Sequence, residues 1–275
     1  LLSIGLSQEL NDISLAQKHP RSSLEQIMLP REAWRPFPTW ADRDGLGQIP
    51  ENIRQIAIAE ATELLQTDWP PLPATVFLQY ARDGNRANYE ALSFGRRHKL
   101  ATLVLAELFE RQGRFMDQII DGIWAICEES FWGVPAHNDG RGLPDVERPI
   151  VDLFAAETGA MMAWITYLLA PQLDEINPLI TQRMLRDTDA RILTPYLEHN
   201  DWGWLGFSWR QRSGYQRPVN NWNPWINSNI IACALILEQD PQRRLDILYK
   251  AMDSLDNFIL PYPADGGCDE GPSYW

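Results

Sequence analysis

The sequence predicts an all-α fold, in the form of an incomplete (α/α) toroid whose inner and outer helices leave a loop-lined cleft at one end. No stretch alternates apolar and polar residues with the β-branched enrichment of a strand. Segments of helical periodicity instead alternate between nearly all-apolar and amphipathic, and loops rich in Trp, Asn and Gly follow alternate helices. An α-solenoid would show a fixed short repeat, and none is visible.

The first fifty residues differ in character from the rest. Residues 1–50 contain several prolines that interrupt short apolar runs, so we expect an N-terminal segment that wraps around the remainder. The toroid domain then occupies residues 51–275. Its first helix is predicted over 51–66 from apolar residues at helical spacing, and the run Trp-Pro-Pro-Leu-Pro at 69–73 ends it.

Two further helices are predicted over 85–111 and 114–129. Apolar residues line one face of the first, and Gly113 follows it as a C-terminal stop. The irregular stretch 131–144 comes next. It is a candidate active-site loop, because loops rich in Gly and Pro are where a helical scaffold displays polar side chains.

An inner helix is predicted over 151–169, because this stretch is apolar on all sides. Glu157 within it should therefore have a partner or face a cavity, since an unpaired buried carboxylate is costly. Residues 173–198 are amphipathic and predict an outer helix. Two more helices, over 224–238 and 242–260, lead to the C-terminal tail.

The charge balance limits the choice of partners. A formal net charge of −13 argues against nucleic acid. Exposed charges more than about 8 Å apart are largely screened at physiological salt, so a local basic cleft can still receive an acidic ligand. Two basic clusters are present, one between Arg82 and Lys99 and one formed by Arg210, Arg212 and Arg217.

The sequence predicts a soluble protein without a membrane partner. It contains no run of about 18 uncharged apolar residues and does not start with the basic and apolar regions of a signal peptide. Cys127, Cys233 and Cys268 are odd in number and far apart, which favours free thiols over a disulfide framework. A cytoplasmic location is favoured, and a periplasmic or secreted one follows if a signal peptide has been removed.

Twelve Trp residues are the most unusual feature of the composition. Flat aromatic faces in a cleft suit sugar rings, while the competing explanation is that large aromatic side chains fill gaps between helices. Trp202, Trp204 and Trp222 stand among Asn, Asp and Arg rather than among aliphatic residues, which favours a substrate-facing role for them.

Two loop segments carry the main candidate catalytic groups. Residues 262–275, Tyr-Pro-Ala-Asp-Gly-Gly-Cys-Asp-Glu-Gly-Pro-Ser-Tyr-Trp, cannot form a continuous helix and must fold as turns that display acids and Tyr274. Residues 220–225, Asn-Asn-Trp-Asn-Pro-Trp, gather amides at the start of an apolar helix. Amides in that position can cap the helix or point at a substrate.

These two motifs resemble the helical domain of the heparinase II/III-like polysaccharide lyases, as do Pro-Ala-His-Asn at 135–138 and Leu-Phe-Ala-Ala-Glu-Thr-Gly at 153–159. The resemblance covers roughly residues 20–275. It implies an incomplete (α/α) toroid that is normally followed by a β-sandwich domain, so the chain is expected to be truncated before that domain. A structural zinc would belong to the absent domain, and no cofactor is expected in this segment.

The resemblance implies a carbon–oxygen lyase that cleaves uronic-acid-containing oligo- or polysaccharides by β-elimination. Tyr274 corresponds to the catalytic tyrosine of that family. Asn220 or Asn221 falls at the position that neutralises the substrate carboxylate, and the choice between them stays open. Related lyases place a histidine next to that asparagine where this sequence has Trp222, and His137 is the nearest substitute.

Two other functions stay open. A glycoside hydrolase would use acids from Asp139, Asp201, Asp269 and Glu270, and a non-catalytic glycan-binding domain would use the tryptophans alone. The sequence contains no His or Cys cluster with metal-ligand spacing. The residues expected to bind substrate are Asn138, Glu157, Trp202, Trp204, Arg212, Asn220, Trp222 and Glu270.

Overall fold

The computed structural model describes residues 14–214, 219–263, 265–267 and 271 of the 275-residue chain. All regular structure in these residues is helical, with no strand among them, so the all-α prediction is confirmed for this part of the chain. The chain forms two compact units. Unit 1 combines residues 1–34 with 193–275, and unit 2 comprises residues 35–192. This division differs from the predicted boundary at residue 50.

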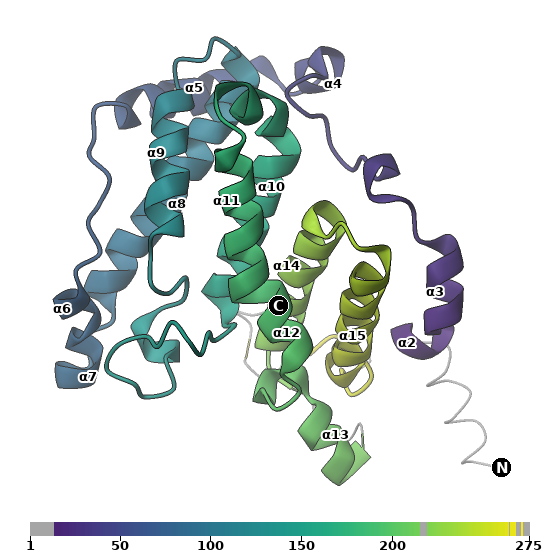
Figure 1. The fold of residues 1–275 in the computed structure, drawn as a ribbon. Helices are drawn as coiled ribbons and strands as arrows, with labels where there is room; N and C mark the ends of the chain where they lie inside the picture. Colours follow the sequence, from purple (N-terminus) through teal and green to yellow (C-terminus); the bar gives the residue numbers. More distant parts are fainter. Residues whose placement is uncertain (1–13, 215–218, 264, 268–270, 272–275) are drawn as a thin grey trace. The chain divides into compact units, whose positions relative to one another are not determined.

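Unit 2 is built around four long helices. In Figure 1, α8, α9, α10 and α11 lie side by side, with α5 packed on α8. Helix α8 also packs on α9 and α10, and α11 packs on both α9 and α10. The elements are α4 (Arg43–Gly47), α5 (Glu51–Leu64), α6 (Ala74–Phe77), α7 (Gln79–Asp83), α8 (Ala87–Glu110), α9 (Met116–Cys127), η2 (Pro135–His137), α10 (Leu153–Ile176), α11 (Leu179–Thr188) and the π-helical turn η3 (Asp189–Leu193).

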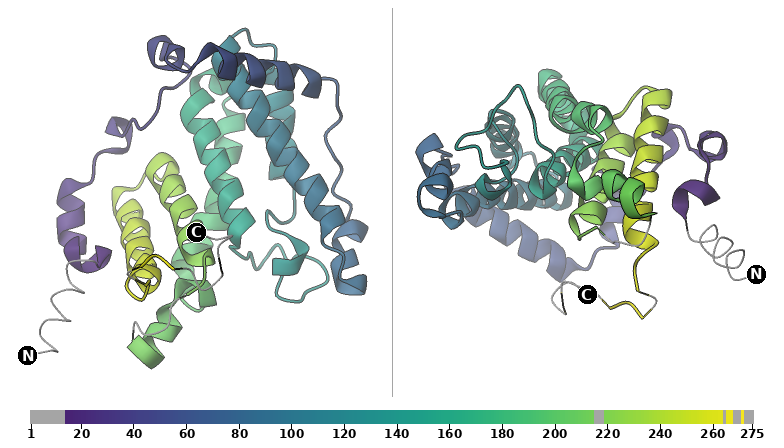
Figure 2. Two further views of the ribbon diagram at one scale, coloured as in Figure 1. Left: turned by 180° about the vertical axis from the view of Figure 1, so that it is seen from behind. Right: turned by 90° about the horizontal axis from the view of Figure 1, so that it is seen from below.

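Unit 1 is built around a pair of helices, α14 and α15, which lie side by side in both views of Figure 2. Helices α2, α3, α12 and α13 all pack on α15. The elements are α2 (Leu15–Lys18), α3 (Arg21–Ile27), η1 (Arg31–Ala33), α12 (Thr194–Glu198), η4 (Gly203–Leu205), α13 (Phe207–Ser213), α14 (Trp222–Leu237) and α15 (Pro241–Ile259).

One buried carboxylate fixes the start of α2 to α15. Asp256 accepts hydrogen bonds from the Ser14 hydroxyl (2.7 Å) and from the backbone N–H groups of Leu15 (2.7 Å) and Ala16 (3.1 Å). The first N–H groups of a helix have no partner within it, so a side chain 240 positions away supplies the acceptor. The described part of the predicted N-terminal segment thus contains short helices, two of which dock on α15.

Most predicted helices are found with small shifts at their ends, but one boundary is wrong. The predicted break between 151–169 and 173–198 followed the change from apolar to amphipathic sequence, but α10 continues through this point and contains Pro171. A proline there loses only the hydrogen bond to the carbonyl of Tyr167, and the packed helix continues. Instead α10 ends at Ile176, because Asn177 precedes a proline and takes an extended conformation (φ −164°, ψ 119°).

Helix α10 is the one described helix that is long and apolar enough to cross a membrane, and half of its most apolar window is buried within the protein. The prediction that this helix is buried on all sides is wrong, because Glu157 lies at an exposed position. Its neighbours Thr158 and Gly159 are buried, so the apolar composition does not mean that the helix is covered on every side.

Candidate functional site

The loop between α9 and α10 in unit 2 holds His137 in one orientation. Nδ1 of His137 lies 2.7 Å from Oδ2 of Asp152, and the ring stacks on Phe154 with the centroids 5.7 Å apart and the planes at 3°. An ionised carboxylate can only accept hydrogen bonds, so Nδ1 carries the proton and Nε2 is the basic nitrogen of the neutral ring. An imidazole held in this way is suited to proton transfer.

Asp152 has a second task at the start of α10. It is fully buried and caps the helix, since Oδ1 accepts a hydrogen bond of 2.7 Å from the N–H of Ala155. The loop reaches this carboxylate only because residue 133 is glycine. A Cβ there would lie 2.6 Å from Oδ1 of Asp152 and 2.4 Å from the ring of Phe131.

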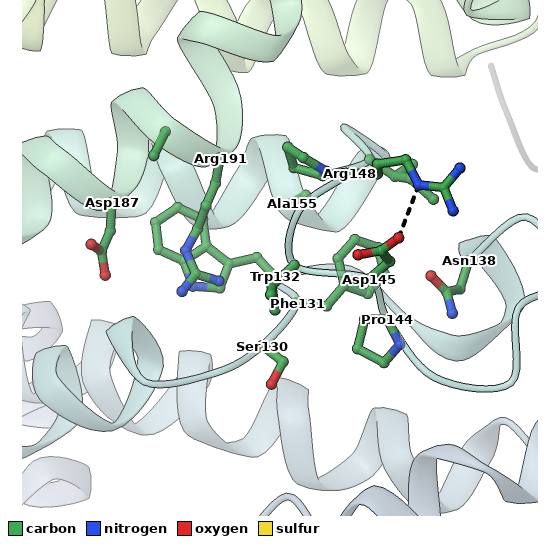
Figure 3. Close-up of a pocket in the computed structure, with 14 residues that line it drawn as sticks. Ser130, Phe131, Trp132, Asn138, Pro144, Asp145, Arg148, Ala155, Asp187 and Arg191 are labelled. Atoms are coloured by element: carbon green, nitrogen blue, oxygen red, sulfur yellow. Dashed lines mark hydrogen bonds and ion pairs between the residues drawn. The ribbon is translucent and has the colours of Figure 1, made fainter.

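A pocket of about 230 Å³ adjoins this loop (Figure 3). Asn138 lines it and is almost completely buried, with Nδ2 donating to the carbonyl of Arg141 (2.9 Å). On the rim, Nε of Arg148 donates to Asp145 (2.9 Å). The lining residues come from the α9–α10 loop, α10, α11 and η3: Ser130, Phe131, Trp132, Asn138, Pro144, Asp145, Val146, Arg148, Pro149, Ile150, Ala155, Asp187, Ala190 and Arg191.

Charged groups are buried next to the pocket. The carboxylate of Glu129, only 2% exposed, pairs with Arg97 (2.7 Å) and Arg96 (3.2 Å), and Arg97 also donates to the hydroxyl of Thr158 (2.9 Å). Burial, aided by the negative charge of Glu129, raises the pKa of Tyr89 to about 12. The hydroxyl group of Tyr89 therefore stays protonated at physiological pH. Tyr89, Arg96 and Glu129 line a second pocket of about 350 Å³.

In unit 1, four aromatic rings form a stack that ends in the buried core. His199 stacks on Trp202 (4.8 Å between centroids), Trp202 on Trp204 (5.6 Å) and Trp204 on Tyr196 (6.2 Å). Tyr196 is fully buried and Trp204 is 9% exposed, whereas Trp202 and His199 are partly exposed. Trp202 lies between His199 and Trp204 in the stack, so the exposed part that it offers to a ligand is the edge of the indole.

Buried amides join this stack to the start of α14. Nδ2 of Asn223 donates to the carbonyl of Trp204 (2.8 Å) and to the carbonyl and hydroxyl of Ser254 (3.0 Å each). Oδ1 of Asn227 accepts from the hydroxyl of Tyr196 (2.9 Å). The loop that carries the tryptophans and the turn that carries the amides of the motif are thus one hydrogen-bonded assembly.

The predicted asparagines precede Asn223. Asn221 is the N-terminal cap residue of α14, but its backbone is helical and its side chain makes no capping hydrogen bond. Asn220 is exposed, and its carbonyl accepts from the N–H of Asn223 (3.1 Å). Trp222, the first residue of α14, is partly buried.

The other predicted site residues fall in three places. Arg212 in unit 1 donates through Nε to the carbonyl of Ser208 (3.0 Å), with its guanidinium over the ring of Trp209. His137, Asn138 and Glu157 belong to unit 2, and the first two share one loop. Tyr274, Glu270, Asp269, Cys268 and Arg217 lie outside the described residues.

Four residues of these two assemblies were not singled out from the sequence: Asp152, Glu129, Arg191 and Asn223. Asp152 carries a recognisable signal, because an aspartate directly before an apolar helical run is a typical N-terminal cap. The others do not, since pairing between residues far apart in the chain depends on tertiary contacts.

The cysteines do not supply a nucleophile in the described residues. Cys127 and Cys233 are buried free thiols. Burial raises the pKa of Cys127 to about 12 and the pKa of Cys233 still further, so both stay protonated. Within the same residues, no group of three or more His, Cys, Asp or Glu side chains is placed to hold a metal ion.

Comparison with known proteins does not identify the chain. A scan against protein-family models finds no match, and a search of curated proteins finds no significant one. The function is therefore argued from the side chains themselves.

Proposed function

We propose that the chain is the helical catalytic domain of a lyase that cleaves uronic-acid-containing oligo- or polysaccharides by β-elimination, and that its helices form an incomplete (α/α) toroid. The observation that carries the proposal is the hydrogen bond from Asn223 to the carbonyl of Trp204, at 2.8 Å. It joins a partly exposed indole, Trp202, to the turn that presents Asn220 and Asn221. Aromatic contact for a sugar ring and amide donors for its carboxylate thus belong to one assembly.

The reaction sets the chemical requirements. A base removes the proton from C5, the electron pair forms the C4=C5 double bond, and the C4–O bond breaks as the leaving oxygen takes a proton. The C5 proton becomes acidic enough only when hydrogen-bond donors neutralise the charge that develops on the neighbouring carboxylate. The site therefore needs donors for the carboxylate, a base and an acid.

The residues are assigned as follows. Asn221, or Asn220 beside it, donates to the carboxylate, and Tyr274 gives the leaving oxygen its proton. His137 belongs to unit 2 and is a candidate proton-transfer group there, since its contact with Asp152 leaves Nε2 as the basic nitrogen. Trp202, stacked between His199 and Trp204, contacts a sugar ring through its exposed edge.

The hydrolase alternative receives less support from the described residues. A glycosidase needs a carboxylic acid whose pKa is raised so that it stays protonated. Asp201 shows the opposite behaviour, because its hydrogen bond with His199 (3.1 Å) lowers its pKa, and it is exposed. An exposed aspartate of low pKa is a poor general acid.

The test is to incubate the protein with a panel of uronic-acid glycans and to follow near-ultraviolet absorbance, which the unsaturated product gives and a hydrolysis product does not. Tyr274→Phe should abolish the absorbing product while binding is retained, and Tyr80→Phe, a partly exposed tyrosine of unit 2, should leave activity unchanged. New reducing ends without absorbance would establish a hydrolase. Glycan binding without either product would establish a binding domain.

A further inference from the structure

Arg191 is a half-buried cation that lines the pocket of unit 2. It lies on the π-helical turn η3, and such turns often occur at functional sites. Its guanidinium stacks over the indole of Trp132, 4.9 Å from the ring centroid, and donates to the carbonyls of Glu129 (2.6 Å) and Cys127 (3.1 Å). Two of the five guanidinium N–H groups are used in these bonds, which leaves three for a ligand.

No carboxylate in the described part of the chain forms an ion pair with Arg191. The nearest ones, Glu129 and Asp187, act on it only through their field, and each is already paired elsewhere. Glu129 pairs with Arg96 and Arg97, while Asp187 pairs with Arg183 and Arg186 (2.9 Å each). Burial lowers the pKa of Arg191, but an arginine keeps its charge in proteins. A desolvated guanidinium without its own counterion favours an anionic ligand.

The shape of the pocket limits that ligand. Its volume of about 230 Å³ is below the ~300–1,000 Å³ of sites for drug-sized molecules, so it suits a single ring. Figure 3 shows Arg191 and Trp132 on one side, and Asn138 with the Arg148–Asp145 pair on the other. Asp145 and Asp187 also line the pocket and disfavour a second negative charge. A planar monoanion that accepts two parallel hydrogen bonds, a carboxylate, fits better than a phosphate.

We propose that this pocket binds the carboxylate of one sugar-acid ring, with Arg191 as its bidentate partner and Arg148 as a second cation at the rim. The identity of the ring as a uronic acid rests on the proposed function. The preference for an anion rests on Arg191 and Arg148 and is independent of that function.

The proposal is tested by calorimetric titration of the protein with glucuronate, with glucose as its uncharged counterpart and with inorganic phosphate. Glucuronate should bind at least tenfold more tightly than glucose or phosphate. Arg191→Gln should weaken glucuronate binding at least tenfold. Arg186→Ala is the control, because Arg186 is 68% exposed and does not line the pocket, and it should bind as the wild type does.

Arg148→Ala keeps the test decisive if Arg191→Gln does not fold. The Arg148 side chain is 71% exposed, so its loss should leave the fold intact while binding of glucuronate falls several-fold. Equal binding of glucose and glucuronate, tighter binding of phosphate, or wild-type affinity in Arg148→Ala would overturn the proposal.

Failure of this proposal can be told apart from failure of the lyase assignment. If the protein forms the absorbing elimination product but does not prefer glucuronate to glucose, the binding proposal is wrong and the lyase assignment stands. If glucuronate binding depends on Arg191 but no elimination product forms, the binding proposal stands and the lyase assignment is wrong.

Discussion

The side-chain nitrogen of Asn223 lies 2.8 Å from the backbone oxygen of Trp204, and both residues are buried. The same nitrogen also contacts Ser254 on α15. One amide therefore connects three elements of unit 1: the aromatic loop, α14 and α15.

Replacing Asn223 by alanine should lower the free energy of unfolding by about 1–3 kcal/mol, because the carbonyls of Trp204 and Ser254 lose a buried donor. The measurement is denaturant unfolding followed by tryptophan fluorescence. Asn220→Ala is the matched control at an exposed position and should change stability by no more than about 0.5 kcal/mol. Equal losses in the two variants would contradict the role given to Asn223.

Gly133→Ala should destabilise unit 2 by about 1–3 kcal/mol, the usual effect of overpacking a buried site. The new methyl group would press on the carboxylate of Asp152 and the ring of Phe131, so the hydrogen bond to His137 should also be disturbed. Gly47→Ala is the control, since its Cβ would meet nothing within 4 Å. The measurement is thermal unfolding of both variants. If Gly133→Ala is as stable as Gly47→Ala, residue 133 does not lie as close to Asp152 and Phe131 as described.

Glu129→Gln removes the partner of two buried guanidinium groups. Breaking a buried ion pair on one side typically costs about 3–5 kcal/mol, so a loss in that range is expected for the free energy of unfolding. Glu60→Gln provides the comparison, because Glu60 pairs with His98 on the surface, where such a pair is worth at most about 1 kcal/mol. A loss below about 1 kcal/mol for Glu129→Gln would show that Arg96 and Arg97 do not depend on this carboxylate.

Lys250 predicts a pH dependence of stability. Burial lowers its pKa from 10.5 to about 8, and its ammonium group donates to the carbonyls of Tyr196 (2.5 Å) and His199 (2.6 Å). Between pH 8 and 10 the unfolded chain therefore binds more protons at this lysine than the folded protein does. Stability should consequently rise with pH in that window.

The comparison with Lys250→Met isolates this contribution. Other groups titrate in both proteins, including Tyr196, whose pKa burial raises. The difference in unfolding free energy, wild type minus variant, should be constant below about pH 7 and increase from pH 8 to 10. A difference that stays flat across this range would show that the lysine is not desolvated.

Much of the helical framework could be predicted, because its signals are local. The pattern over 85–111 marks α8 within two residues at its start and one at its end, since apolar spacing and capping depend only on neighbours in sequence. The same reasoning failed at Pro171, where packing of α10 outweighs a local helix-breaking preference, and at Glu157, where composition alone could not tell which side of α10 is open.

The candidate site was predicted less completely. Residues 131–144 lie between α9 and α10 as predicted, and His137 and Asn138 share that loop, whereas Trp222 and Asn223 of the second motif already belong to α14. The residues that orient them are distant in sequence or lie in another element. Arg191 contacts Trp132, 59 residues earlier in the chain, only because α11 packs on α9, and no pattern within either segment predicts that contact.

The hydrogen bonds that Asp256 accepts from the start of α2 determine when residues 14–34 can fold during synthesis. All of unit 2 has left the ribosome before residue 256 is made, whereas residues 14–34 must wait for their partner in α15. Domains generally fold as they emerge. The earliest described part of the protein to be translated is therefore among the last to reach its folded position.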